Sequence, residues 1–192
     1  MKNVDIISKS RDLLDGKWLP AIGLVIIFSL LTSLPNRLDD NLSFLSIVIG
    51  GPLNLGLAMF FQKVVRGQNS GIENLFDGFR NYLQSTVAFI LTLVVVAIGF
   101  LLLIIPGIIM AMGLSQTFFI MADDDNISGI DAMKKSWEMM DGFKMKYFLL
   151  SLIHIGMALL GILALVVGIF YALPIIYNSM ALFYDKLKMK EL

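Results

Sequence analysis

Four long runs of apolar residues, separated by short polar segments, dominate the chain. They cover Trp18–Leu34, Phe44–Phe61, Leu83–Ala122 and Phe148–Tyr184. A helix needs about 20 apolar residues to cross a hydrocarbon core roughly 30 Å thick, so the first two runs predict one transmembrane helix each. The last two runs have 40 and 37 residues and would form helices of about 60 and 55 Å, which is too long for one crossing.

Each of the two longest runs therefore predicts a pair of spans joined by a tight turn. Proline removes a helical hydrogen bond and often ends a helix, so the turns are expected at Ile105-Pro106-Gly107 and near Leu173-Pro174. Six transmembrane helices result.

The polar segments before the first, third and fifth spans share a motif. Each ends in Asp-Gly, followed within two positions by a basic residue: Asp15-Gly16, Asp77-Gly78 and Asp141-Gly142. The aspartates are 62 and 64 positions apart, and a regular spacing on this scale indicates internal repeats. The glycine is expected to make the turn that leads from a surface helix into a span.

The segment before each Asp-Gly is amphipathic at helical spacing. In the clearest copy, Ile130, Met133 and Trp137 recur on one face, opposite Lys134 and Lys135. Such helices are expected to lie flat on the membrane surface. They either anchor and orient the bundle, or they bind lipid headgroups or a partner.

The predicted fold class is all-α: an integral membrane bundle of six transmembrane helices in three repeats, each an amphipathic interfacial helix plus a two-span hairpin. The whole chain, residues 1–192, forms one membrane domain, with repeats of about 1–65, 66–126 and 127–192. Packing of the repeats around a pseudo-threefold axis is a hypothesis.

Basic residues predict the topology. Fourteen of the fifteen Lys and Arg fall on one side of the predicted spans, and only Arg37, beside Asp39 and Asp40, falls in a loop on the other side. Because positively charged loops stay in the cytoplasm, both termini are expected there, with the chain crossing the bacterial inner membrane several times. The segment from Trp18 lacks a small-residue cleavage site, so it is expected to be a retained anchor.

Composition agrees with this class and excludes others. Apolar residues make up 57% of the chain and charged residues 16%, and the mean hydropathy is +0.81. In soluble proteins, apolar residues average roughly 45 to 50% and charged residues roughly 25%. The absence of cysteine excludes disulfides and thiolate chemistry. Balanced charge, with 15 basic and 15 acidic residues, gives no support for a nucleic-acid partner.

Three carboxamides recur within the second spans of the predicted repeats. They are Asn54, Gln116 and Asn178, and each is 62 positions from the next. Amides within a bilayer must find partners, so they either hydrogen-bond between helices or line a polar path.

Other intramembrane features have two interpretations each. Gly50-Gly51-Pro52 predicts either a broken helix that exposes backbone groups to an ion or substrate, or a structural kink. His154, the single histidine, is either a functional ionisable group or a neutral, hydrogen-bonded packing residue.

The run Asp123-Asp124-Asp125 also has two interpretations. Clustered carboxylates suit calcium or magnesium, although the spacing is not that of an EF-hand. Asp125, Asn126 or Ser128 is alternatively expected to cap the helix that follows. No cofactor or metal is predicted.

Several segments of the chain resemble a known family. They are Met121–Ser128 (MADDDNIS), Ala132–Ser136 (AMKKS), Met139–Lys144 (MMDGFK) and Ala181–Tyr184 (ALFY). They resemble a family of bacterial polytopic inner-membrane proteins known only as a domain of unknown function, and the likeness is strongest over about residues 100–187. The chain is also distantly similar to the membrane domain of some glycerophosphodiester phosphodiesterases. It departs from the pattern at Leu173-Pro174-Ile175, where an aromatic residue is expected after the proline. The resemblance implies a multi-span inner-membrane protein and carries over no catalytic residues.

Three classes of function follow. The first is a membrane module without catalytic activity, a scaffold or lipid-associated protein, with membrane lipids as partners and another membrane protein as a further candidate. The alternative is a small transporter or channel whose polar path is lined by the intramembrane amides. An intramembrane enzyme is disfavoured, because a lone histidine without a carboxylate in any span makes no catalytic triad.

Overall fold

The computed structural model describes residues 1–38, 43–164 and 167–192, and these residues form helices without any strand. The elements are α1 (Asn3–Asp12), α2 (Trp18–Leu38), α3 (Ser43–Val65), α4 (Asn74–Asp77), the 3₁₀ helix η2 (Gly78–Asn81), α5 (Tyr82–Leu102), α6 (Ile104–Leu114), α7 (Thr117–Asp123), α8 (Gly129–Met139), α9 (Lys144–Leu163) and α10 (Val167–Lys188). Of the outer loop predicted around Arg37, residues 39–42, which include Asp39 and Asp40, lie outside the described part.

Six candidate spans are present, as predicted. Each is a helical segment long and apolar enough to cross a membrane: Trp18–Pro35, Phe44–Val65, Asn74–Leu102, Ile104–Asp123, Lys144–Leu163 and Val167–Lys188. They indicate a membrane protein. Successive spans pack as three hairpins, α2 with α3, α5 with α6, and α9 with α10.

The turn of the second hairpin lies two residues earlier than predicted. Leu103 has an extended backbone, with φ −166° and ψ 157°, and it separates α5 from α6. Pro106 follows within the first turn of α6. The first amides of a helix have no intrahelical partner, so proline at this place begins the second span and does not end the first.

The predicted turn near Leu173-Pro174 is wrong. Pro174 lies inside α10, which runs without a break from Val167 to Lys188, and α9 already ends at Leu163. Length explains the difference: a second span beginning after Leu173 and ending at Tyr184 would be only about 17 Å long. Starting the helix at Val167 makes it long enough for the hydrocarbon core.

Helix α3 also continues through its proline, so of the two interpretations of Gly50-Gly51-Pro52 the broken helix is not observed. Proline leaves the carbonyl four residues earlier without a donor, and that carbonyl belongs to Val48. The Thr86 hydroxyl of α5 donates to it across a distance of 3.3 Å. Gly51 permits this approach, since a Cβ there would lie 2.4 Å from the Ser85 carbonyl oxygen. The segment is therefore a helix-packing site.

Replacing Thr86 with valine tests this role. The substitution keeps the shape but removes the donor to Val48, so we expect the free energy of unfolding to fall by about 1 kcal/mol. In a Pro52→Ala background the alanine amide supplies the missing donor, and Thr86→Val should then cost much less. Unfolding titrations of the four proteins of this double-mutant cycle measure the coupling, and equal costs in both backgrounds would contradict it.

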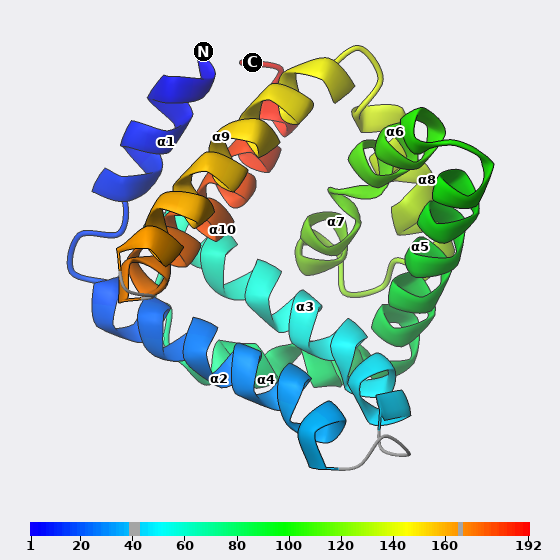
Figure 1. The fold of residues 1–192 in the computed structure, drawn as a ribbon, viewed down its shortest axis with the longest axis horizontal. Coiled ribbons are helices and arrows are strands. Elements are labelled where there is room, and N and C mark those ends of the chain that lie inside the picture. The colour runs from blue at the N-terminus through cyan, green and yellow to red at the C-terminus, as the bar shows by residue number, and fades with distance from the viewer. Residues whose placement is uncertain (39–42, 165–166) are drawn as a thin grey trace.

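Helix α3 occupies the middle of the molecule and packs against α2, α5, α7 and α10. The two ends of the chain lie close together (Figure 1). An aromatic core forms where α3, α7 and α10 meet. Phe61 stacks on Tyr177 with 5.6 Å between ring centroids, and Phe119 stacks on Tyr184 with 5.7 Å. Burial of these rings ties α3, α7 and α10 to one another.

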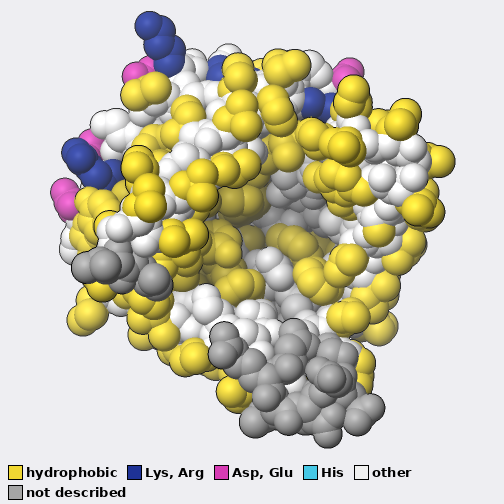
Figure 2. Space-filling model, viewed as in Figure 1, with side chains coloured by type: hydrophobic (Ala, Val, Ile, Leu, Met, Phe, Trp, Pro, Cys, Tyr) yellow, Lys and Arg dark blue, Asp and Glu magenta, His cyan; other side chains and the backbone are white. Residues whose placement is uncertain are grey.

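Hydrophobic side chains cover most of the face shown in Figure 2, and this face is hollowed at its centre. The hollow lies between α3, α7 and α10 (Figures 1 and 2). The charged side chains visible on this face lie over α1, around the two termini and near the turn between α8 and α9. An apolar exterior of this kind fits contact with lipid.

Candidate functional site

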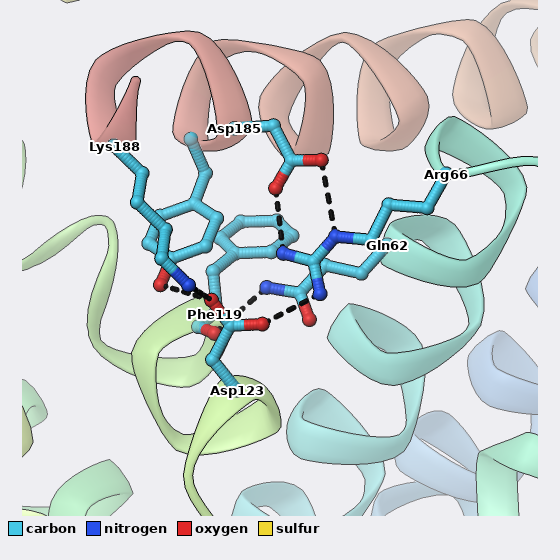
Figure 3. Close-up of polar contacts among 7 residues, drawn as sticks. Gln62, Arg66, Phe119, Asp123, Asp185 and Lys188 are labelled. Carbon is cyan, nitrogen blue, oxygen red and sulfur yellow. Dashed lines mark hydrogen bonds and ion pairs between the residues drawn. The ribbon is translucent and has the colours of Figure 1, made fainter. Parts of the chain in front are cut away.

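A cluster of charged side chains joins the ends of α3, α7 and α10 (Figure 3). We call it the charge network and define it as Arg66, Asp123, Tyr184, Asp185 and Lys188. Arg66 directly follows α3, Asp123 is the last residue of α7, and the other three belong to the last turns of α10. The network therefore holds together the three helices that converge on the aromatic core.

Arg66 is the centre of the network. It binds Asp185 through two parallel hydrogen bonds, Nε to Oδ2 at 3.1 Å and Nη2 to Oδ1 at 2.6 Å, and its Nη1 donates to Asp123 Oδ1 at 2.6 Å. The Asp185 side chain is only 6% exposed. The hydrogen bond with Asp185, followed by that with Asp123, raises the pKa of Arg66 above its ordinary value. The guanidinium is thus permanently charged and geometrically fixed, as is usual for bidentate arginine pairs.

Asp123 receives two further donors. Its Oδ2 accepts from the Tyr184 hydroxyl and from Lys188 Nζ, both at 2.7 Å. Beneath the network, Gln62 Nε2 donates to the Phe119 carbonyl at 2.7 Å (Figure 3). Each carboxylate in the network is therefore neutralised by a cation from another helix, which is the condition for keeping it half-buried or buried.

No sequence pattern predicts this site. Arg66 and Lys188 are expected only as basic residues outside the spans, and no carboxylate is expected in a span, whereas Asp185 is buried within α10. One signal was available: Asp123 and Asp185 are 62 positions apart, which is the spacing of the three carboxamides.

The aspartate run is divided between several roles. Asp123 belongs to the network, and Asp124 Oδ1 accepts from the Asn126 amide at 3.0 Å. Ser128 caps α8, with its hydroxyl oxygen accepting from the Asp131 amide at 3.1 Å, so one of the predicted caps is confirmed. Within residues 1–38, 43–164 and 167–192, no group of His, Cys, Asp or Glu is arranged to hold a metal ion.

Beside the network, a polar cavity of about 320 Å³ opens between the end of α3, η2 and the end of α7. Its charged lining residues are Lys63, Arg66, Asp77, Arg80 and Asp125. Asp77 lies 3.7 Å from Lys63 Nζ and 3.3 Å from Arg80 Nη2. The cavity can therefore offer both cationic donors and carboxylate acceptors to a polar ligand.

The three carboxamides have different environments. Asn54 Nδ2 donates to the Gly50 carbonyl of its own helix at 2.8 Å. Gln116 Nε2 donates to the neighbouring Ser115 hydroxyl at 2.8 Å, and Asn178 Nδ2 donates to the Ser10 carbonyl of α1 at 2.7 Å. Asn178 thus bonds the backbone of another helix, and within the described part of the chain no hydrogen bond joins two of the three carboxamides.

The fourth candidate span consists of two helices, α6 and α7, which meet at Gln116. This break is not predicted from the sequence. The residues Ser115 and Gln116 separate α6 from α7. The buried Ser136 hydroxyl of α8 bridges this break, because it accepts from the Gln116 amide at 3.1 Å and donates to the Gly113 carbonyl at 2.7 Å. A side chain of α8 thus replaces the helical hydrogen bond that the break removes.

Substitution of Asn178 by leucine should loosen α1. The change removes the bond to Ser10, so we expect a loss of about 1 kcal/mol and faster amide hydrogen exchange in residues 3–12. Asn54→Leu is the matched control, because Asn54 bonds only its own helix. Equal exchange of α1 in both variants would show that Asn178 does not hold this helix.

His154 packs against α10. Its Nε2 lies 2.6 Å from Ser179 Oγ, and the Ser179 hydroxyl donates to the Ile176 carbonyl at 2.7 Å. Since a hydroxyl has one hydrogen and a carbonyl can only accept, this pattern makes His154 Nε2 the donor to Ser179. The geometry corresponds to the hydrogen-bonded packing interpretation of this histidine.

The three Asp-Gly motifs are not alike. Gly16 and Gly142 have φ of +74° and +76°, the left-handed conformation that glycine tolerates best, and they make the expected turns. Gly78 does not: its φ is −61°. It is instead a close-contact position, because a Cβ there would lie 2.0 Å from the Pro52 carbonyl oxygen. Asp77 contributes to the cavity described above, whereas Asp141 is exposed and Asp15 lies in the turn before α2.

Comparison with known proteins adds the family. Residues 85–191 match the family described as Protein of unknown function (DUF975). The chain belongs to this family. The matched segment contains Asp123, Asp185 and Lys188 of the charge network but not Arg66, so the network joins the DUF975 segment to the helices that precede it. No curated protein and no solved structure gives a significant match to the chain. The similarity to the membrane domain of glycerophosphodiester phosphodiesterases stays a prediction.

Proposed function

We propose that this DUF975 protein is a lipid-associated module of the bacterial inner membrane without catalytic activity. The observation that carries the proposal is a pair of apolar grooves between helices, each with one lysine in its lining. One, of about 310 Å³, is lined by Leu91, Val95, Leu114, Ile130, Met133, Lys134 and Trp137. The other, of about 280 Å³, is lined by Ile105, Ile108, Ile109, Met112, Lys144, Met145 and Phe148. An apolar groove next to a cation suits an acyl chain and its anionic headgroup.

We further propose that the chain is built of three repeats that close into a ring. The first helix of each repeat packs on the second span of the repeat before it: α4 on α3, and α8 on α6 and α7. Helix α1 of the first repeat packs on α10 of the third, which would complete the ring. Ser10 and Ser136, which align when the Asp-Gly motifs are superposed, both take part in these contacts.

The charge network and both termini are placed on the cytoplasmic side in this proposal. The support is the distribution of basic residues, since Lys63, Arg66, Arg80 and Lys188 all lie at ends of spans that the positive-inside rule assigns to the cytoplasm. The interfacial helices are proposed to lie on the same side. The cation of Lys144 lies 4.5 Å from the centre of the Trp137 ring and joins the start of α9 to α8.

Native mass spectrometry of protein released from lipid nanodiscs tests the function. We expect phospholipid to stay bound, and we expect Lys134→Glu with Lys144→Glu to reduce the retained anionic phospholipid several-fold. A protein released without lipid from every composition would contradict lipid association and favour a scaffold for another membrane protein, whose copurification the same spectra would report.

A small transporter or channel is the second candidate, and one observation favours it. The Gln116 Oε1 and Asn178 Oδ1 atoms are buried and meet no donor within the described part of the chain, so each could accept a hydrogen bond from a permeating water or solute. In proteoliposomes, this alternative expects Gln116→Leu and Asn178→Leu to abolish flux without unfolding the protein. Unchanged flux would remove it.

A further inference from the structure

The polar cavity beside the charge network has the composition of a ligand site. It lies where α3 and α7 end, and its two basic walls come from different elements, Lys63 from the last turn of α3 and Arg80 from η2. Asn81 Nδ2 donates to the Asp125 carbonyl at 3.1 Å, which joins η2 to the segment after α7. Its volume of about 320 Å³ falls at the lower end of the range for small-molecule sites.

The basic residues of this cavity keep donors for a ligand. Lys63 and Arg80 approach Asp77 only at 3.7 and 3.3 Å, whereas the strong hydrogen bond of Asp77 comes from Asn74 Nδ2 at 2.7 Å. Arg80 is 84% exposed, so its guanidinium can turn toward an anion at little cost. Two cations that share one loosely bound carboxylate form an incomplete charge balance, which a phosphate oxygen between them would complete.

The neutral lining of the cavity is both polar and apolar. Gln68 and Asn81 add amide donors, while Met59 of α3 and Ala122 of α7 are apolar. Asp77 and Asp125 remain as acceptors for hydroxyl or ammonium groups of the same ligand. This arrangement suits a phosphate ester that carries a second polar group and is bound at the level of the lipid headgroups.

We propose that this cavity binds the phosphate group of a phosphate ester, with Lys63 and Arg80 as its charged donors. The site is separate from the apolar grooves, and the inference deepens the proposed lipid association by naming the headgroup that would be recognised. The phosphate can come from a membrane phospholipid or from a soluble ester, and the experiment distinguishes these sources.

The test compares the full-length protein with Lys63→Gln/Arg80→Gln. The matched control is Lys9→Gln/Arg11→Gln, which removes one lysine and one arginine from exposed positions of α1. The first arm measures phospholipid retained after release from nanodiscs of phosphatidylethanolamine and phosphatidylglycerol. The second arm measures binding of glycerol 3-phosphate to the protein in a detergent solution that contains no other phosphate. Thermal unfolding of each protein confirms that the variants remain folded.

If the site holds a phospholipid, its occupancy should fall about tenfold or more in the cavity variant, while phospholipid in the two apolar grooves stays and the control matches the wild type. If the site holds a soluble ester, the wild type should bind glycerol 3-phosphate, and the cavity variant should bind it about tenfold or more weakly. Equal binding by the folded cavity variant and the wild type in both arms would overturn the inference. If the wild type and the cavity variant retain lipid equally and do not differ in binding glycerol 3-phosphate, lipid association stands and the site fails; if only the soluble ester binds, and does so less in the cavity variant, the site stands and lipid association fails.

Discussion

Replacing Arg66 with methionine is expected to lower the free energy of unfolding by about 3 kcal/mol or more. The substitution leaves Asp185, which is 6% exposed, as a buried carboxylate without its bidentate partner. Asp123 keeps Lys188 and Tyr184 as donors, so most of the cost should come from Asp185. Unfolding titrations in a denaturing detergent, followed by helical circular dichroism, measure the effect.

Two further variants show whether the uncompensated charge causes this loss. Asp185→Leu in the Arg66→Met background removes the stranded carboxylate and should recover most of the stability, because replacing a buried pair by apolar residues is often neutral. Arg80→Met, at an 84% exposed arginine, should change stability little. If the double variant is no more stable than Arg66→Met alone, the network is not the source of the stabilisation.

Gly56→Ala is expected to disrupt the contact between α3 and α4. A Cβ at position 56 would lie 2.0 Å from the Leu75 carbonyl oxygen and 2.8 Å from its Cα. The obstacle is backbone and cannot move aside by a change of rotamer, so we expect a loss of about 3 kcal/mol, at the upper end of the usual cost of overpacking. A lower thermal midpoint in detergent, with exposure of residues 74–77 to proteolysis, would be the result.

Gly156→Ala is the matched control. It is also a glycine within a candidate span, Lys144–Leu163, but a Cβ there meets nothing within 4 Å, and alanine favours the helix over glycine by up to about 1 kcal/mol. Its thermal midpoint should be unchanged or slightly raised. Similar midpoints for the two variants would mean that α3 and α4 do not pack as closely as the structure places them.

The six helices could be predicted from the sequence because length and hydropathy determine them almost alone. Their turns could not, because a proline is compatible with both a turn and a continuous helix. Pro106 begins a span, while Pro52 lies inside one, where Thr86 from a helix 38 residues away in sequence offers a donor to the freed carbonyl. Whether such a donor exists depends on packing, and no local pattern encodes it.

The charge network was beyond prediction for a related reason. Arg66 and Asp185 are 119 positions apart, and a basic residue after a span has the same local sequence whether it faces water or a carboxylate. Gly78 illustrates the same limit, because it shares the Asp-Gly motif with Gly16 and Gly142 but serves close packing. The 62-residue spacing of Asp123 and Asp185 could have drawn attention to both carboxylates, but it says nothing about Arg66.

The bond between Asn178 and Ser10 bears on how the chain is made. These residues are 168 positions apart, so α1 is synthesised long before its main partner α10. Until α10 is made, α1 lacks most of its native contacts, and the hairpins made earlier await the last one before the bundle can close. A ribosome that stalls before Asn178 would therefore release a chain with an unattached first helix, a form that membrane proteases can recognise.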